Sequence, residues 1–395
     1  MIDPAVLAAD LAWPLTLLIA WAMGEVGQRW LRIPRISIYA IVGFLLASPQ
    51  TGFLPPAPSE SMRLLANIAF GLIIFEAGYR INLRWLRANP WIALTSLAES
   101  ALSFGAVYAL VRWRGMAEDP ALMVSALAMA TSPATVLRVI TELRASGQVT
   151  ERIMHLSALN TALAVLVLKV LVGLTPAGSV GDVPEATYDT VLVLLAAVLS
   201  GLLMGGFVPA LLKAVRRTTQ DGTIAYAIAV IVLAALNHSL GLSPMLATLT
   251  FGLVSRHRRV FLTATQRGFG TLGSVLTVVL FVFAAVSLEW RQVSAAFGLG
   301  VAIILVRQVA KVAAVGSFSF LSGISWRKGL FTGLAMAPMS AIALLVLEQS
   351  REIDLGLLDT LAPLAAASLL MEMLGPIIAG RVLHFAQETP DTQEG

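Results

Sequence analysis

The feature that most constrains this chain is a series of thirteen apolar windows, most of them about 20 residues long, separated by short polar breaks. A helix of that length spans the hydrocarbon core of a bilayer. Only 13% of the 395 residues are charged, against roughly a quarter in an ordinary soluble domain, so the composition excludes a water-soluble enzyme of this size. The windows lie at approximately 11–29, 36–53, 63–80, 90–111, 119–142, 152–174, 189–212, 222–240, 243–255, 270–288, 294–316, 328–348 and 355–380. The sequence therefore predicts an all-α membrane protein with about 13 transmembrane helices.

The Lys and Arg residues between the windows lie mostly on one side of the predicted membrane. With the N-terminus outside, eighteen of them lie on the cytoplasmic side and five on the other, as expected from the positive-inside rule. The C-terminus is then cytoplasmic. The first window lacks a basic leader and a cleavage site, so we expect a retained helix. Because the basic residues are spread among the loops, the pI near 9.7 indicates membrane orientation rather than nucleic-acid binding.

Residue types exclude several kinds of chemistry. The chain has no Cys, which excludes disulfides, thiolate metal sites and Cys catalysis. Its four His residues share no helical spacing, and no phosphate-binding loop or catalytic triad is visible. We therefore expect no cofactor, no resident metal and no enzymatic activity.

The chain resembles itself at an offset near 208 residues. Segment 127–130, followed by Pro133, recurs as segment 334–337, followed by Pro338, and Phe75 maps to Phe283. Pro34 with Gly43 nine residues later recurs as Pro244 with Gly252 eight residues later. Since an odd number of helices separates equivalent positions, the second repeat is inverted relative to the first.

This repeat sets the expected domain organisation. We predict a single membrane domain over 1–395, with repeat 1 at about 11–175, a linker helix at 189–212 and repeat 2 at about 222–385. A short cytoplasmic tail follows at 386–395. The ninth window, 243–255, is short for a span, so it extends into the Arg-rich loop after it or is partly re-entrant.

Two apolar windows are interrupted by Pro at matching places in the repeats, at Pro133 and Pro338. Paired interruptions of this kind are typical of the substrate site of secondary transporters, where two broken helices cross. Unwound backbone leaves carbonyl groups free at mid-membrane, where they replace the water around a small ion. The alternative is a pair of ordinary Pro kinks.

Six stretches of the chain are similar to characteristic stretches of the monovalent cation:proton antiporter superfamily, which includes the sodium/proton exchangers. The stretches are Arg32-Ile33-Pro34 through Gly43-Phe44-Leu45-Leu46, Phe75-Glu76-Ala77-Gly78 with Asn82-Leu83-Arg84, Ala130-Thr131-Ser132, Gly241-Leu242-Ser243-Pro244, Ser325-Trp326-Arg327-Lys328 and Leu334-Ala335-Met336-Ala337-Pro338. The resemblance implies a mobile core domain near 90–174 and 294–380, a dimerisation domain from the remaining helices, a homodimer, and transport by an elevator movement of the core.

The predicted ion site departs from the family pattern. Where the exchangers carry Ser-x-x-Asn-Asp, this chain has Ser157, Asn160 and then Thr161 in place of the Asp. Where many exchangers have Thr-Asp-Pro at the first break, this chain has Thr131-Ser132-Pro133. By the resemblance, the cation site is lined by Thr131, Ser132, Ser157, Asn160 and Thr161, which bind a cation through oxygen but do not titrate.

A cation/proton exchanger needs a titrating group, and Glu76 is the leading candidate for this role and for the ion site, with Glu99 as its helper. Glu76 matches a Glu near the cation in some exchangers, although it also lies one turn before Arg80 and forms an interfacial pair with it in the alternative interpretation. Glu99 lies in the middle of the fourth window, and the repeat offset pairs it with Arg307. A Glu99–Arg307 ion pair is therefore our hypothesis for the core.

Three further polar residues lie in or near the predicted site. Lys311 lies one turn beyond Arg307, where a family branch places a Lys that pairs with its core carboxylate; with Thr161 there instead, Glu99 or Glu372 remains as its partner. His155 is interpreted as a polar lining residue at the cytoplasmic mouth. Lys169 lies near the outer end of its helix, so we expect its side chain to reach the interface.

The leading hypothesis is a bacterial-type inner-membrane antiporter of Na⁺ or K⁺ for H⁺. A second hypothesis keeps the fold and changes the cargo to an anion or organic acid, because basic residues in the core are at least as numerous as acids. A third hypothesis is a membrane sensor or scaffold that does not transport.

Overall fold

The computed structural model describes residues 4–31, 33–55, 60–174, 183–214, 219–258, 269–286, 290–339 and 355–390. Within these ranges the chain forms fifteen α-helices and no β-strand. Each of the thirteen predicted windows contains at least part of a helix. The all-α class is thereby confirmed.

The first half of the chain contains one helix that the apolar pattern does not predict. The helices of this half are α1 (Pro4–Leu31), α2 (Arg35–Leu46), α3 (Glu60–Arg80), α4 (Leu83–Ala88), α5 (Pro90–Trp113), α6 (Glu118–Met129), α7 (Pro133–Glu142), α8 (Gln148–Leu174) and α9 (Val183–Ala214). The unpredicted helix α4 is too short to give a periodic signal. Asn82 starts it by accepting hydrogen bonds from the N–H groups of Arg84 and Trp85.

The second half repeats this succession of long and short helices. Its members are α10 (Thr219–Ser239), α11 (Pro244–His257), α13 (Gly270–Val286), α14 (Trp290–Ser317), α15 (Trp326–Ala335) and α17 (Leu355–Phe385). The short ninth window corresponds to α11, which extends into the Arg-rich segment as far as His257. Its N-terminus is set by Ser243, which caps the helix, and by Pro244 in the first turn.

Six helices of the described part are long and apolar enough to cross a membrane by length and composition, on α5, α8, α9, α10, α14 and α17. Large apolar side chains are exposed along these helices; on α9, for example, Leu203 is 65% exposed and Phe207 is 61% exposed. Such surfaces are unfavourable in water but match the acyl chains of a bilayer.

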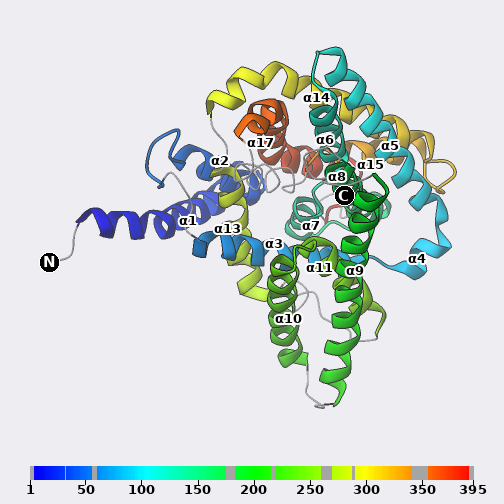
Figure 1. Ribbon diagram of the computed structural model, residues 1–395, viewed down its shortest axis with the longest axis horizontal. Helices are drawn as coiled ribbons and strands as arrows, with labels where there is room; N and C mark the ends of the chain where they lie inside the picture. Colours follow the sequence, from blue (N-terminus) through cyan, green and yellow to red (C-terminus); the bar gives the residue numbers. More distant parts are fainter. Residues whose placement is uncertain are drawn as a thin grey trace.

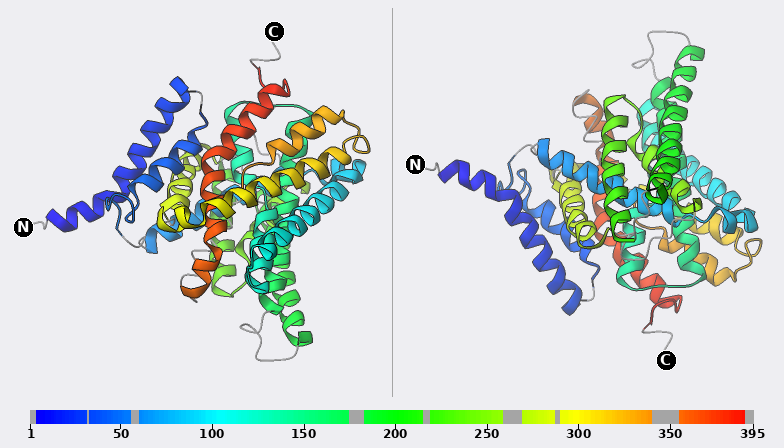
Figure 2. Two further views of the ribbon diagram at one scale, coloured as in Figure 1. Left: turned by 90° about the horizontal axis from the view of Figure 1, so that it is seen from above. Right: turned by 90° about the horizontal axis from the view of Figure 1, so that it is seen from below.

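The helices form two groups around a common centre. In one group, α11 packs between α3 and α9, and α10 lies beside them (Figure 1). In the other, α14 packs against α5, α15 and α17, and Figure 1 shows α6, α7 and α8 lying toward the middle of the molecule. The N-terminal part of α1 projects away from the remaining helices in every view (Figures 1 and 2).

Two glycines explain why two pairs of helices, α11 with α3 and α2 with α13, cross so closely. A Cβ atom on Gly252 of α11 would lie 2.1 Å from the carbonyl oxygen of Phe75 in α3, and one on Gly43 of α2 would lie 2.6 Å from the carbonyl oxygen of Val282 in α13. Only glycine allows backbones to approach this closely. These are the glycines that recur in the sequence repeat, so the repeat is reflected in the packing.

Candidate functional site

The first predicted break lies between α6 and α7. Helix α6 ends at Met129 and α7 begins at Pro133, which leaves Ala130, Thr131 and Ser132 outside both helices. The hydroxyl of Ser132 accepts a hydrogen bond from the N–H of Thr135, and so caps α7. Pro133 is well suited to a first helical position, because the N–H that it lacks has no partner there.

The second predicted break follows α15, which ends at Ala335. Pro338 lies in the non-helical stretch 336–339. Residues 340–354, which contain the rest of the predicted window, lie outside the described residues.

The two breaks contact each other directly. Thr131 and Met339 form an antiparallel β-bridge, and the N–H of Ser132 donates to the carbonyl oxygen of Pro338 at 3.1 Å. Thr131 and Met339 are related by the offset of the sequence repeat. The predicted pair of crossed broken helices is thereby confirmed, and the crossing lies where the repeats meet.

Arg307 of α14 occupies the crossing. Its guanidinium, which is fully buried, donates hydrogen bonds to acceptors on both broken segments. These acceptors are the carbonyl oxygens of Ala128 (2.6 Å), Ala130 (2.9 Å), Ala337 (3.1 Å), Met336 (3.3 Å) and Pro338 (3.4 Å), and the hydroxyl of Thr131 (3.5 Å). We expected these carbonyl groups to be free to bind a transported ion. Arg307 instead donates hydrogen bonds to them. A guanidinium does this well because its five N–H groups form a planar fork.

Lys311 lies one turn further along α14 and forms the central ion pair. Its ammonium nitrogen is 2.7 Å from Oε2 of Glu99 on α5 and 2.8 Å from the carbonyl oxygen of Met129. Both charged side chains are fully buried. Each charge thus has an opposite partner inside the protein, which offsets part of the penalty for removing it from water.

Glu99 also contacts the polar segment of α8. The side-chain amide of Asn160 donates to Oε1 of Glu99 at 2.5 Å and to the hydroxyl of Thr131 at 3.0 Å. The N–H of Thr131 donates to the amide oxygen of Asn160, and the hydroxyl of Thr161 donates to the carbonyl oxygen of Thr131 at 2.6 Å. Glu99, Thr131, Asn160, Thr161 and Lys311 form one connected network, which we call the core network.

The hypothesis of a Glu99–Arg307 ion pair is wrong in its choice of partner. Symmetry-related positions do meet at the crossing, but Glu99 pairs with Lys311, while Arg307 donates to backbone carbonyls. The reason is geometric: the C-terminal ends of two half-helices converge on Arg307 and supply several acceptors. Glu372, the other partner considered for Lys311, forms no ion pair with it in the described part of the chain.

The two predicted serines make local contacts. Ser132 caps α7, and Ser157 donates to the carbonyl oxygen of Met154 in its own helix at 3.1 Å. Within the described part of the chain, neither hydroxyl bonds to a side chain of the core network. Their assignment as cation ligands stays a prediction.

Glu76 has a neighbour that the sequence did not suggest. Its buried carboxylate lies 3.8 Å from the guanidinium of Arg138 on α7. The side chains of Arg80, its expected partner, and of Lys169 lie outside the described part. Arg138 was not recognised in the sequence, because no spacing rule connects positions on different helices.

His155 is held by the backbone and by an aromatic ring. Its Nε2 accepts from the N–H of Asn82 at 3.2 Å, its Nδ1 lies 2.7 Å from the carbonyl oxygen of Glu151, and its ring stacks on Trp85. Its side chain is 1% exposed, so the interpretation of His155 as a lining residue stays a prediction.

The start of the predicted tail forms part of the core, which the sequence did not reveal. The carboxylate of Glu388 accepts from the N–H groups of Val149 and Thr150 at 2.8 and 2.7 Å, and from the Thr150 hydroxyl. Its carbonyl oxygen accepts from the N–H of Ser146. Glu388 therefore closes the N-terminus of α8, the helix that carries Asn160.

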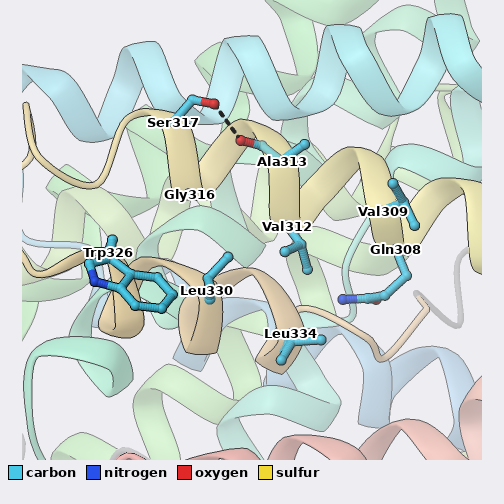
Figure 3. A pocket seen from close by; sticks show the side chains of 9 residues that line it. All are labelled: Gln308, Val309, Val312, Ala313, Gly316, Ser317, Trp326, Leu330 and Leu334. Carbon is cyan, nitrogen blue, oxygen red and sulfur yellow. Dashed lines mark hydrogen bonds between the residues drawn. The ribbon is translucent and has the colours of Figure 1, made fainter.

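An apolar groove lies beside the core network rather than in it. It has a volume of about 630 Å³ and is formed by α14 and α15. Figure 3 shows Leu330 and Leu334 of α15 facing Val312 and Gln308 of α14 across it. No residue of the core network lines it. Within the described residues, no group of three His, Asp or Glu side chains is arranged to hold a metal ion.

Inverted repeats with crossed broken helices, and a buried ion pair at the crossing, define the class of secondary membrane transporters. A family model described as "Sodium/hydrogen exchanger, transmembrane" matches residues 15–384, so the chain belongs to this family of multi-pass membrane transporters. The family and the fold are those of transporters rather than enzymes.

Known relatives agree with this assignment. The chain is 28% identical over 177 residues to the low-affinity Na⁺/H⁺ antiporter NhaS1 of Synechocystis sp. (strain ATCC 27184 / PCC 6803 / Kazusa). That match covers 44% of this chain and 33% of the relative, so the chain matches about a third of the relative's length. The fold is similar to that of the sodium proton antiporter MjNhaP1 from Methanocaldococcus jannaschii at pH 8, with a TM-score of 0.72, 16% identity, and coverage of 96% of this chain and 98% of that one. An electron-microscopy structure of MjNhaP1 gives a TM-score of 0.71 at 16% identity, covering 98% of this chain and 96% of the other.

Proposed function

We propose that the protein is a monovalent cation/proton antiporter, exchanging Na⁺ or K⁺ for H⁺, with Glu99 as the titrating carboxylate. The observation that carries this proposal is that Glu99 contacts both Lys311 and Asn160 at the crossing of the broken helices. The Asp that the exchangers carry at the position of Thr161 is thus replaced by an acid that reaches the same place from α5.

The chemistry of exchange follows from the charge of Glu99. In the empty site, the ammonium of Lys311 balances the carboxylate. A monovalent cation bound to Glu99 replaces Lys311 as the counter-charge, and a proton on Glu99 removes the need for one. Cation and proton therefore exclude each other at one carboxylate, which is the basis of coupled exchange.

The oxygens around Glu99 suit an alkali cation. The amide oxygen of Asn160 and the hydroxyls of Thr131 and Thr161 lie within one hydrogen-bonded network. They offer neutral oxygen ligands that match a hard cation. Arg307 holds the two broken segments together, so that these oxygens keep their positions.

Glu76 has a second role in this proposal. Paired with Arg138 at α7, it is a candidate for attracting cations toward the core from the cytoplasmic side. Ser132 and Ser157 are proposed to join the cation's ligands only when the core moves, because each now bonds within its own segment.

The remaining features follow from the family. We propose an inner-membrane protein with its N-terminus outside and its C-terminus in the cytoplasm. The core of repeats near 90–174 and 294–380 moves as an elevator against the other helices, which form the homodimer interface. The C-terminal end of α1 carries Trp30, which is 80% exposed, and Leu31, which is 64% exposed, and these apolar side chains support a place for α1 in the dimer contact.

Reconstituted protein tests the proposal. Proteoliposomes with an imposed pH gradient should dissipate it on addition of Na⁺ or K⁺ but not of choline. Glu99→Gln should abolish this response. Glu118→Gln, which changes an exposed carboxylate at the start of α6, should retain it.

The rival functions make different predictions in the same vesicles. Flux that depends on chloride or a carboxylate and ignores Na⁺ and K⁺ would favour an anion carrier, consistent with the buried Arg307 and Lys311. A sensor or scaffold would show no flux and no cation-dependent thermal stabilisation, whereas a ligand that binds the folded state raises its stability.

A further inference from the structure

A second buried acid lies in the core and takes no part in the network around Glu99. Glu372 of α17 is 2% exposed. Its Oε1 has no hydrogen-bond partner within the described residues. One turn earlier, Ser368 is 1% exposed and its hydroxyl also lacks a partner there. Unsatisfied buried polar atoms are rare in folded proteins, and an unseen water or ion is a common explanation.

Both side chains lie on the face of α17 that packs on the second break. Ser368, Glu372 and Gly375 follow the i, i+4, i+7 spacing of one helix face. A Cβ atom on Gly375 would lie 2.7 Å from the Cα of Pro338. The Ser368 hydroxyl and the Glu372 carboxylate therefore lie on the same face of α17 as Gly375, which contacts Pro338 in the second break.

The repeat gives Ser368 a counterpart in the core network. The offset that relates Thr131 to Met339 also relates Asn160 to Ser368. In repeat 1 the equivalent of Glu372 is Ala164, so the acid at this position belongs to repeat 2 alone.

No basic group among the described neighbours neutralises Glu372. Helix α17 packs against α2, α6, α7, α14 and α15. On these helices Arg307 and Lys311 are engaged at the crossing, and Arg138 pairs with Glu76. The other titratable side chains on the same helices are Arg35, Tyr39, Glu118, Asp119, Glu142, Arg291, Arg327 and Lys328. Within the described residues, none of them forms an ion pair or a hydrogen bond with Glu372.

We propose that Glu372 and Ser368 form a second ion site, in repeat 2, that holds a proton when vacant and a monovalent cation when Glu372 is ionised. An ionised carboxylate without a partner is strongly unfavourable inside the membrane, so a vacant site keeps its proton. When a cation binds, it supplies the missing positive charge and the proton leaves to solvent. This inference rests on the proposed exchange function and extends it to a second carboxylate.

Infrared difference spectroscopy tests this site directly, because a protonated carboxyl group has a carbonyl absorption that an ionised one lacks. In the purified full-length protein at neutral pH, addition of Na⁺ or K⁺ should reduce this absorption, and choline should not. Glu372→Gln should lack the cation-dependent signal, and Glu118→Gln should keep it. An unchanged signal in a folded Glu372→Gln protein would overturn the proposal.

Ser368→Ala provides a test that does not remove the acid. Loss of one oxygen ligand, at about 1 kcal/mol, should raise the cation concentration needed for half of the infrared change about fivefold. An unchanged midpoint in this variant would also overturn the assigned site.

Glu99→Gln separates this inference from the proposed function. That variant should lose exchange and yet keep the infrared signal of Glu372. If Glu99→Gln removes the signal while Glu372→Gln retains it, the second site is wrong and the role of Glu99 stands. If wild-type vesicles show no exchange while the signal still depends on cation, the proposed function fails and the site remains.

Discussion

Three fully buried charged residues, Glu99, Arg307 and Lys311, meet around the crossing of the broken helices. They are tolerated in the membrane because each has partners: an opposite charge for Glu99 and Lys311, and backbone carbonyls for Arg307. Removing one partner leaves the other buried and uncompensated, which is more unfavourable than the absence of the whole pair. The stability of these buried charges therefore depends on their partners.

Replacing Arg307 by Lys tests whether the hydrogen bonds of the guanidinium, and not only its charge, stabilise the protein. Arg307→Lys keeps the charge but loses several hydrogen bonds to the two broken segments. We expect the unfolding free energy to fall by about 2–3 kcal/mol, seen as a lower melting temperature in detergent. Arg291→Lys, an exposed position on the same helix, is the control and should melt like wild type; equal melting of both variants would contradict the role of Arg307.

A double-mutant cycle tests the pairing of Glu99 with Lys311. Each single variant, Glu99→Gln and Lys311→Met, should lower the unfolding free energy by about 3–5 kcal/mol, because it leaves a buried charge alone. The double variant should be more stable than the sum of the two effects predicts. Simple additivity in thermal unfolding would rule out a direct ion pair.

At this scale the sequence predicted which residues would meet, but not every contact between them. The repeat offset brought Glu99 and Arg307 to the same crossing, and the family pattern named Thr131, Asn160 and Thr161, which the structure joins. The sequence offered both Arg307 and Lys311 as partners of Glu99, and the structure selects Lys311. That choice depends on how side chains reach across three helices, which no spacing along the chain records. The same reason hid the contact of Glu76 with Arg138.

Helix packing depends on positions where backbones touch. Gly252→Ala places a methyl group against the backbone of α3, so the helices must separate, and we expect a loss of about 1–3 kcal/mol in unfolding free energy. Gly105→Ala on α5 meets nothing within 4 Å and should be neutral or stabilising. Thermal unfolding of the two variants measures the difference, and equal melting temperatures would refute the close crossing.

The contact of Glu388 with α8 connects the end of the chain to the helix of the core network. Glu388→Gln removes the negative charge from the N-terminus of α8, and we expect a loss of about 1 kcal/mol in unfolding free energy. Glu151→Gln changes an exposed acid in the first turn of the same helix and should have a smaller effect. A greater loss of thermal stability for Glu151→Gln would contradict the capping role.

Element types were predictable because apolar windows and Pro positions are local signals. All thirteen windows contain helix, and the first break falls at Pro133. The helix α4 and the capping contact of Glu388 were missed, since one is too short for periodicity and the other joins residues 238 or more positions apart.

At the scale of the whole molecule, the inverted repeat places two half-helix ends against each other and fills the space with basic side chains. The bridge between Thr131 and Met339 lies at the repeat offset. In the proposed function, an acid on α5 takes the role that the family assigns to an acid on α8. The proposed exchange depends on a carboxylate that reaches the crossing from α5 instead of α8.

The central claim is that cation and proton compete at Glu99, and the KM for cation uptake at different pH values tests it most directly. With wild-type proteoliposomes, we expect KM for Na⁺ or K⁺ to rise as pH falls, by up to about tenfold per pH unit, because proton and cation compete for one carboxylate. Glu99→Gln should abolish uptake or leave a KM that does not change with pH. A wild-type pH dependence of KM that persists unchanged in Glu99→Gln would contradict the account.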